Sequence, residues 1–218
     1  MTEVTDARSF RLQDGRDVRL GGIEPAFPAE AAAKRQRALT AILAGRDVQL
    51  RGEDDTPDRY GRQTAFVWLL PQETLVQQEL LTEGAAVVSA TVNDRECAAA
   101  LLAAEASARE AKRGIWADPA VIKNAESPGD ILAGIGRIML VEGKVLSVRQ
   151  AGATTYLIFG RNWTRDFAVT IPRRRSPTWR PPALSLRYWN TNVFVSGGLL
   201  RRIPDHGLRW FGRDKLSC

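Results

Sequence analysis

The stretch "RSFRLQDGRDVRLGGI", residues 8–23, decides how the chain begins to fold. Apolar and polar residues alternate on both sides of Asp14-Gly15, a dipeptide that strongly favours a tight turn between two strands. The alternating apolar residues are Phe10, Leu12, Val18 and Leu20. This pattern predicts a β-hairpin at the start of the chain.

Helical and extended patterns follow the hairpin. The expected helices cover residues 29–44, 73–84 and 97–114, each ending at a glycine. Expected strands cover 47–52 and 62–70, with an acidic turn at 53–58 between them. Beyond a proline-containing stretch the pattern is mostly extended, at 136–150, 154–160, 166–171, 192–203 and 208–216.

Length and composition are those of a globular chain. The 218 residues, 44% hydrophobic and 26% charged, suffice for one large or two modest domains. No apolar run approaches the roughly 20 residues of a membrane-spanning helix. No secretory signal precedes the first expected strand, but a leader absent from this sequence stays an option, so the compartment is left open.

Cysteine and histidine usage excludes several kinds of site. Cys97 and Cys218 are far apart, which excludes a disulfide framework or a zinc site and predicts two unlinked thiols. With His206 as the single histidine, a His-dependent nucleophile or a multi-histidine metal centre is excluded. Hydrolytic chemistry would have to use carboxylates, arginines and a hard metal ion.

Charge is distributed unevenly along the chain. Residues 119–218 contain 3 Lys and 13 Arg against 6 acidic residues, a formal charge of +10. Residues 1–118 contain 15 basic and 19 acidic residues, a formal charge of −4. The basic excess of the second half predicts an anionic partner there.

Four stretches in the first 118 residues occur in an order typical of one family. They are "SFRLQDGRDVRLGGIEP", "DRYGRQTAFVWL", "LLTEGAAVV" and "LLAAEASAREAKRGIWADP". On these residues the chain resembles the staphylococcal nuclease, or thermonuclease-like, family. The resemblance implies an α+β fold, a five-stranded OB-type barrel with three helices, and calcium-dependent hydrolysis of DNA or RNA phosphodiesters.

The resemblance also implies a domain organisation. A thermonuclease-like domain would span residues 1–118, and a linker would span 119–130. Residues 131–218 would form a smaller, basic, β-rich domain, for which a second OB-like barrel is one option. Within it, "LVEGKVLSV" and "TTYLIFGRNWTRDFAVTIPRR" are similar to a module that follows nuclease-like domains in some bacterial proteins.

The family's chemistry needs carboxylates to hold the cation, a carboxylate to activate water, and arginines to neutralise the phosphoryl oxygens. By the resemblance, Arg19 and Arg62 match the two arginines, and Glu24 matches one metal-binding carboxylate. Arg8 and Phe27 stand where the family has a metal-binding aspartate and the general-base glutamate. The resemblance therefore implies a remnant site without its general base.

Alternatives to a lost site remain open. Glu30, Asp6 or the acidic turn 53–58 could supply a displaced carboxylate, in which case Ca²⁺ would be the cofactor; otherwise no cofactor is expected. Glu30 could equally favour a helix dipole, and the turn could be solvated. Arg19 and Arg62 could instead form a structural ion cluster with Glu24 and neighbouring acids.

A basic and aromatic stretch lies in the second half, at residues 172–189. Its cations and aromatic rings are the types that bind phosphates and unstacked bases of single-stranded nucleic acid. These residues are Arg173, Arg174, Arg175, Trp179, Arg180, Arg187, Tyr188 and Trp189. A contact with the acidic first domain or a protein partner, and a contact with anionic lipid headgroups, are the alternatives.

The sequence thus predicts a thermonuclease-like protein with impaired catalysis, a pseudoenzyme that binds nucleic acid or another polyanion. A metal-dependent phosphodiesterase with a displaced carboxylate is one alternative. A non-catalytic protein-interaction or scaffold module is the other.

Overall fold

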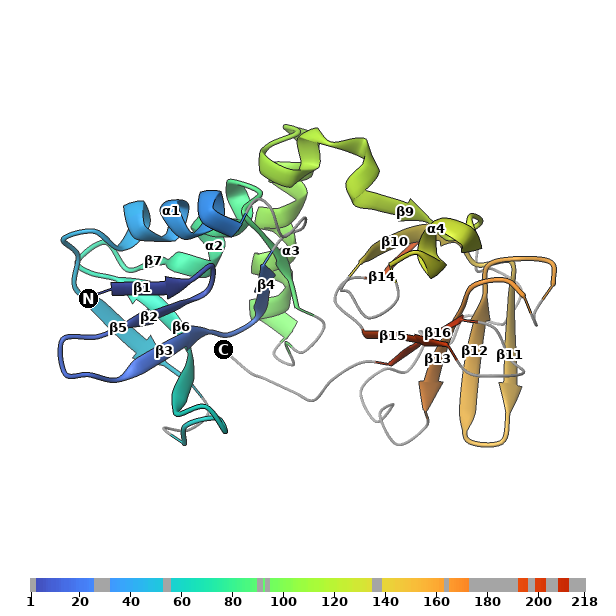
Figure 1. The fold of residues 1–218 in the computed structure, drawn as a ribbon, viewed down its shortest axis with the longest axis horizontal. Coiled ribbons are helices and arrows are strands. Elements are labelled where there is room, and N and C mark those ends of the chain that lie inside the picture. The colour runs from blue at the N-terminus through green and yellow to red at the C-terminus, as the bar shows by residue number, and fades with distance from the viewer. Residues whose placement is uncertain are drawn as a thin grey trace. The chain divides into compact units, whose positions relative to one another are not determined.

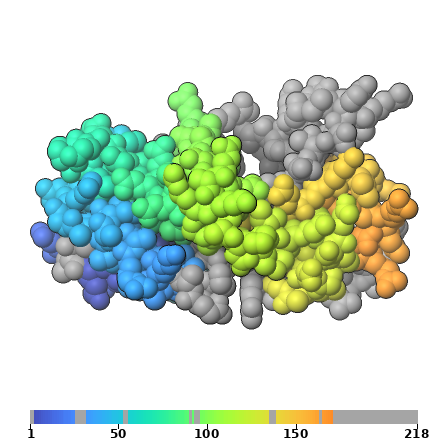
Figure 2. Space-filling model, turned by 90° about the horizontal axis from the view of Figure 1, so that it is seen from above, coloured from blue at the N-terminus to red at the C-terminus, as the bar shows by residue number. Residues whose placement is uncertain are grey.

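The computed structural model describes residues 3–25, 32–52, 56–89, 92, 95–134, 139–162 and 165–172, and the backbone of strands 192–195, 199–202 and 208–211. The chain divides into two compact units, Met1–Val121 with Asp214–Cys218, and Ile122–Arg213. Figure 2 colours the first unit from blue to green and the second from yellow-green to orange. The limits 118 and 131 expected from the sequence stay a prediction.

The expected hairpin is present. Strands β2 (Ser9–Arg11) and β3 (Asp17–Leu20) pair antiparallel, and Phe10 lies opposite Val18. The turn closes through a hydrogen bond from the Gly15 amide to the Leu12 carbonyl at 3.1 Å. Strand β1 (Glu3–Asp6) adds to the outer edge of β2.

A mixed sheet forms around this hairpin. Strand β6 (Arg62–Leu69) runs parallel to β3, and β5 (Val48–Arg51) and β7 (Thr74–Leu75) pair antiparallel with β6. The order is β1-β2-β3-β6-β5, and β4 (Ile23–Pro25) pairs separately with β8 (Ala86–Val88). The hydrogen-bonded path of the described strands is open at β1 and β5, so these strands do not form a closed barrel.

Three helices form where the periodicity predicts them, and the first two pack against this sheet. They are α1 (Ala32–Leu43), α2 (Val76–Thr82) and α3 (Arg95–Glu110). Helix α1 packs against β1, α2 packs against β6, and α3 packs against α2 and β8 (Figure 1). The expected helix at 73–84 begins later, because Thr74 and Leu75 pair with β6 as β7.

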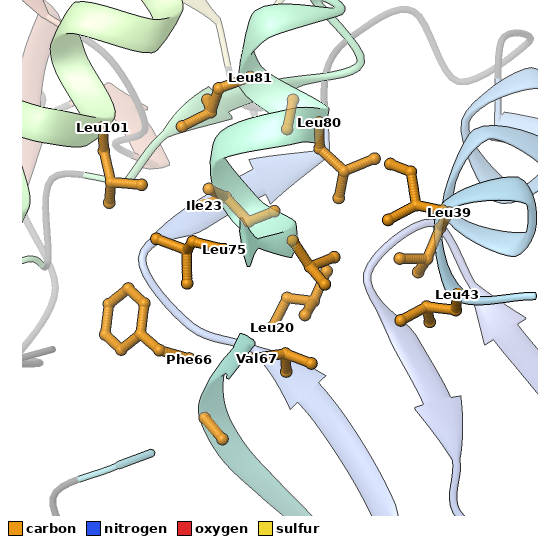
Figure 3. Packing of buried hydrophobic residues seen from close by; sticks show 14 of the residues in the cluster. Leu20, Ile23, Leu39, Leu43, Phe66, Val67, Leu75, Leu80, Leu81 and Leu101 are labelled. Atoms are coloured by element: carbon orange, nitrogen blue, oxygen red, sulfur yellow. The ribbon is translucent and has the colours of Figure 1, made fainter. Parts of the chain in front are cut away.

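The hydrophobic core of the first unit lies between the sheet and the helices. Figure 3 shows side chains from β3, β4, β6 and all three helices converging there. They include Leu20, Ile23, Leu39, Leu43, Phe66, Val67, Leu75, Leu80, Leu81 and Leu101. Two short 3₁₀ helices, Gly114–Ala117 and Pro119–Val121, follow α3.

The second unit has its own sheets and core. Strands β11 (Ser147–Ala151), β12 (Thr154–Ile158), β13 (Ala168–Pro172), β16 (Leu208–Phe211) and β15 (Leu199–Arg202) form one sheet in this order. Strands β14 (Asn192–Val195), β10 (Leu140–Lys144) and β9 (Ile122–Asn124) form another. Its core gathers Ala125, Ile131, Val141, Val145, Leu157, Phe159, Phe167 and Val169.

Two expectations about strands are corrected in the second unit. The strand expected at 136–150 is two strands, β10 and β11, separated at Val145 and Leu146. The strand expected at 192–203 is also two, β14 and β15. The stretch 119–130 contains β9 and the start of α4 (Pro128–Leu132).

Cys97 corrects the expectation of two unlinked thiols, because it is disulfide-bonded. Spacing along the chain could not show this, since a disulfide depends on proximity in space.

In the described part of the chain, no helix is long and apolar enough to cross a membrane.

Candidate functional site

Five charged residues of the first unit gather around the β3–β4 connection. Arg19 lies on β3 and Glu24 on β4, Arg8 lies in the turn before β2, and Asp58 and Arg62 flank the loop that leads into β6. Three guanidinium groups and two carboxylates give this cluster a formal charge of +1. We refer to these five residues as the arginine cluster.

The sheet register explains why the cluster forms. Residues opposite one another on paired strands share a face of the sheet. Ser9 on β2 lies opposite Arg19, and Arg19 lies opposite Thr64 on β6. In the adjacent row, Asp17 on β3 lies opposite Arg62. The two arginines named by the resemblance, 43 positions apart in the sequence, therefore project from neighbouring rows of one sheet face.

Arg8 forms an ion pair with Glu24. The Arg8 Nη1 group donates a hydrogen bond to Glu24 Oε2 and a second to the Ile23 carbonyl at 3.4 Å. The side chains are 20% and 17% exposed, so the pair is partly shielded from water. The Arg8 carbonyl accepts a 2.8 Å hydrogen bond from the Leu20 amide, which fixes the turn beside β3. Glu24 is thereby already occupied by a cationic side chain.

Asp58 organises the loop that presents Arg62. Its Oδ1 accepts hydrogen bonds from the amides of Tyr60 at 2.8 Å and Arg62 at 3.1 Å. Its Oδ2 accepts two more from the Arg62 guanidinium, at 3.1 and 2.8 Å. Burial alone would raise the pKa of the Asp58 carboxyl, but these hydrogen bonds outweigh burial and hold the pKa at about 2.

Arg19 is the least satisfied cation of the cluster. Its ion-pair partner Asp58 has Oδ2 3.9 Å from Nη1 of Arg19, too far for a hydrogen bond. Burial lowers the pKa of the Arg19 guanidinium, and repulsion from Arg8 lowers it further. A half-buried guanidinium without a hydrogen-bond acceptor among the described residues is suited to receiving an anion.

Tyr60 extends the cluster to the protein surface. The residue is 64% exposed, and the guanidinium carbons of Arg59 and Arg62 lie 4.7 and 5.0 Å from the centroid of its ring. Contacts of this kind hold guanidinium groups over an aromatic face. The aromatic ring next to the arginines adds an apolar surface to the cationic one.

Gln77 supports the site from below and was missed by sequence reasoning. It is fully buried on α2, and its amide nitrogen donates to the carbonyls of Gly21 at 3.2 Å and Ala65 at 3.0 Å. Its Oε1 accepts a hydrogen bond from the Val67 amide at 3.2 Å. The signal was a polar residue on the apolar stripe of the helix, three and four positions before Leu80 and Leu81.

Gly22 fixes the connection between Arg19 and Glu24. Its φ is +73°, and a Cβ there would lie 2.9 Å from the Phe66 ring and 3.3 Å from a Leu101 methyl. Only glycine fits both the backbone conformation and the space. The glycine pair of "RLGGIEP" therefore has a packing reason.

The remaining candidate residues from the sequence are Asp6 and residues that the structure does not describe. Asp6 accepts a 2.8 Å hydrogen bond from the Arg8 amide, so it caps the turn. Phe27, Glu30 and the acidic residues 53–55 lie outside the described residues. The stretch with Arg173, Arg174, Arg175, Trp179, Arg180, Arg187, Tyr188 and Trp189 also lies outside them. The described residues contain no group of three or more His, Cys, Asp or Glu side chains that could hold a metal ion.

The first unit is a mixed α+β domain with an arginine-rich cluster at the junction of β3, β4 and β6. Residues 21–118 match the family model described as Staphylococcal nuclease homologue, so the chain contains a staphylococcal-nuclease-like domain. The resemblance seen in the sequence is thereby confirmed for this domain, and the family implies an OB-type fold. A comparison with curated proteins returned no match.

Proposed function

We propose that the nuclease-like domain is an impaired hydrolase, of OB-barrel ancestry, that binds phosphate groups of nucleic acid without a metal ion. The ion pair between Arg8 and Glu24 is the observation that carries this proposal. It supplies a fixed positive charge beside the carboxylate that corresponds, by the resemblance, to a metal-binding position.

The residues of the arginine cluster do not fit a calcium ion. Ca²⁺ takes six to eight oxygen ligands, largely from carboxylates and carbonyls. Glu24 is paired with Arg8, and Asp58 accepts four hydrogen bonds from residues 60 and 62. At about 4 Å and an effective dielectric constant near 20, a guanidinium repels each unit of cation charge by roughly 4 kcal/mol.

The same residues suit a phosphate. The cluster carries a formal charge of +1, and Arg19 has no hydrogen-bond acceptor among the described residues. Guanidinium groups bind phosphate oxygens through paired, charge-assisted hydrogen bonds. With Phe27 at the general-base position, no carboxylate is expected there to activate water, a loss worth about 10²–10⁴ in rate.

The test is a titration of the full chain with a fluorescent single-stranded DNA oligonucleotide, with Ca²⁺ and with a chelator, scoring binding and cleavage together. We expect binding that weakens steeply with salt, is unchanged by the chelator, and gives no cleavage. Arg19→Ala should weaken binding about tenfold or more, the loss of one charge-assisted contact. Arg46→Ala removes the same charge from an exposed position at the end of α1 and serves as the matched control.

Two outcomes would overturn the proposal. Ca²⁺-stimulated cleavage that disappears in Arg62→Ala would identify an active phosphodiesterase with a displaced carboxylate. Absence of both binding and cleavage would leave a protein-interaction or scaffold role. If binding is present but insensitive to Arg19→Ala, a triple alanine variant of Arg173, Arg174 and Arg175 tests whether the basic stretch carries it.

A further inference from the structure

Cys97 is a buried cysteine that has no role in the proposed function. It lies near the start of α3 and is 7% exposed. It belongs to the core with Leu101 and Ala104, at the helical spacing of a buried stripe. Glu105 and Ala108 continue the same stripe, so the side chain of Cys97 is held by the packing of α3.

The sulfur of Cys97 is disulfide-bonded, and no described residue is a free cysteine. The sequence contains one other cysteine, Cys218. We infer that Cys97 and Cys218 form an intrachain disulfide that closes the second half of the chain into a covalent loop. This inference is independent of the proposed function, because it uses neither the arginine cluster nor the basic stretch.

The bond would change how the two units are connected. The chain passes from the first unit to the second at residues 121–122, and α3 belongs to the first unit. The chain returns to the first unit at residues 213–214, so a link from Cys218 to Cys97 ties this returning end to α3 and places the second unit within a closed covalent loop. Closing a loop of this length restricts the unfolded chain strongly and so stabilises the folded one.

Formation of the bond is a two-electron oxidation. The two thiols lose two protons and two electrons, and a disulfide oxidant, such as oxidised glutathione, accepts them and is reduced to two thiols. Disulfides of this kind persist in oxidising compartments and are rare where thiols are kept reduced. The inference therefore assigns the working protein to an oxidising environment.

Peptide mapping of the full chain tests the bond directly. The chain is equilibrated with oxidised and reduced glutathione, quenched with N-ethylmaleimide, and digested with trypsin without reductant. Cleavage after Arg95, Arg109 and Lys215 places Cys97 in peptide 96–109 and Cys218 in peptide 216–218. We expect these two peptides to be joined, and dithiothreitol to separate them.

The variant Cys218→Ser, which lacks one of the two sulfur atoms, is the matched control. In Cys218→Ser, Cys97 should become labelled with N-ethylmaleimide once the protein is unfolded, and the joined peptide should be absent. The unreduced wild-type monomer should migrate faster on a denaturing gel than this variant. Labelling of both wild-type cysteines would overturn the inference, and so would dimers linked through two copies of peptide 216–218.

Discussion

At the scale of single residues, Asp58 gives the arginine cluster a measurable dependence on pH. Its pKa is lowered from 3.8 to about 2 in the folded chain. A carboxyl with a depressed pKa stabilises the fold above its unfolded pKa and loses that contribution as pH falls through its folded pKa. The stabilisation by Asp58 is therefore complete above about pH 4 and is lost progressively toward pH 2.

Asp58→Asn should remove this dependence. Asn retains one acceptor for the amides of Tyr60 and Arg62 but lacks the charge that faces the Arg62 guanidinium. We expect the variant to be less stable at pH 7 by about 1 kcal/mol, a modest value because the pair is partly exposed. Urea unfolding from pH 7 to pH 2 checks this; parallel curves for wild type and variant would contradict it.

Arg8 should be the residue that keeps metal ions away from Glu24. Arg8→Asp changes the formal charge of the arginine cluster from +1 to −1 and places a second carboxylate beside Glu24. We expect Ca²⁺ affinity to appear at a dissociation constant of about 10⁻⁴–10⁻³ M and oligonucleotide affinity to fall. Calorimetric titration with Ca²⁺ measures the gain. Arg46→Asp makes the same charge change at a remote position and should bind no Ca²⁺.

At the scale of elements, Glu105 joins α3 to β8. The residue is 3% exposed, and its carboxylate accepts a 2.6 Å hydrogen bond from the Val88 amide. Burial raises the pKa of Glu105 above 4.5, so its ionisation costs stability as pH rises above that value. Glu105→Gln keeps an acceptor and removes the charge, so the variant should be at least as stable as wild type at pH 7.

Two further variants on α3 separate the loss of the Glu105 charge from the loss of its hydrogen bond. Glu105→Ala leaves the buried Val88 amide without this acceptor and should cost about 1–3 kcal/mol. Glu110→Gln, at an exposed position, should leave the free energy of unfolding within about 0.5 kcal/mol. A large loss of stability in Glu105→Gln would show that the charge itself holds α3 on β8.

Gly22 tests how tightly the β3–β4 connection is packed against α3. Gly15 and Gly22 both have positive φ, but a Cβ at Gly15 would meet nothing within 4 Å, whereas a Cβ at Gly22 would meet Phe66 and Leu101. Gly15→Ala therefore measures the backbone penalty alone, and Gly22→Ala adds steric overlap worth about 1–3 kcal/mol. Urea midpoints compare the two variants; equal losses would mean that Phe66 moves aside freely.

Local elements of the first unit could be predicted from sequence because their signals are local. Asp14-Gly15 sets the hairpin, and apolar spacing with a terminal glycine sets α1, α2 and α3. The pairing of β3 with β6, 42 or more residues apart, depends on tertiary packing and has no local signal. Helical periodicity places Thr74 and Leu75 in a helix, because it cannot show that these two residues pair with β6 as a short strand.

The sequence predicted which residues make up the candidate site better than it predicted which of them form ion pairs with one another. Residue types and the resemblance named Arg8, Arg19, Glu24 and Arg62 together. The pairing follows from the sheet register and loop geometry. Arg62 pairs with Asp58 and Arg8 pairs with Glu24, and among the described residues Arg19 then has no hydrogen-bond acceptor. The burial of Gln77 beneath the site likewise depends on which face of α2 meets the sheet.

At the scale of the whole molecule, the two units have separate hydrophobic cores. The core of the first runs from Val4 to Ala104, and that of the second from Ala125 to Val169. Because the two cores share no residue in the part of the chain that the structure describes, we expect residues 1–121, with Cys97 kept reduced, to unfold cooperatively on their own. Circular dichroism during urea unfolding checks this, and a gradual transition would mean that the first core needs the rest of the chain.

The uneven distribution of charge predicts that the two units contribute differently to nucleic-acid binding. The basic excess of +10 lies in residues 119–218, whereas residues 1–118 carry −4. For single strands the logarithm of affinity falls with the logarithm of salt concentration with a slope of about −0.7 per neutralised phosphate. We expect the arginine cluster to position a phosphate and the second unit to supply most of the electrostatic attraction. The folded fragment 1–121 should then bind single-stranded DNA weakly. Its affinity should fall with salt concentration with a much shallower slope than that of the full chain. Equal slopes would place all of the phosphate contacts in the nuclease-like domain, and the basic excess of the second unit would then need a different anionic partner.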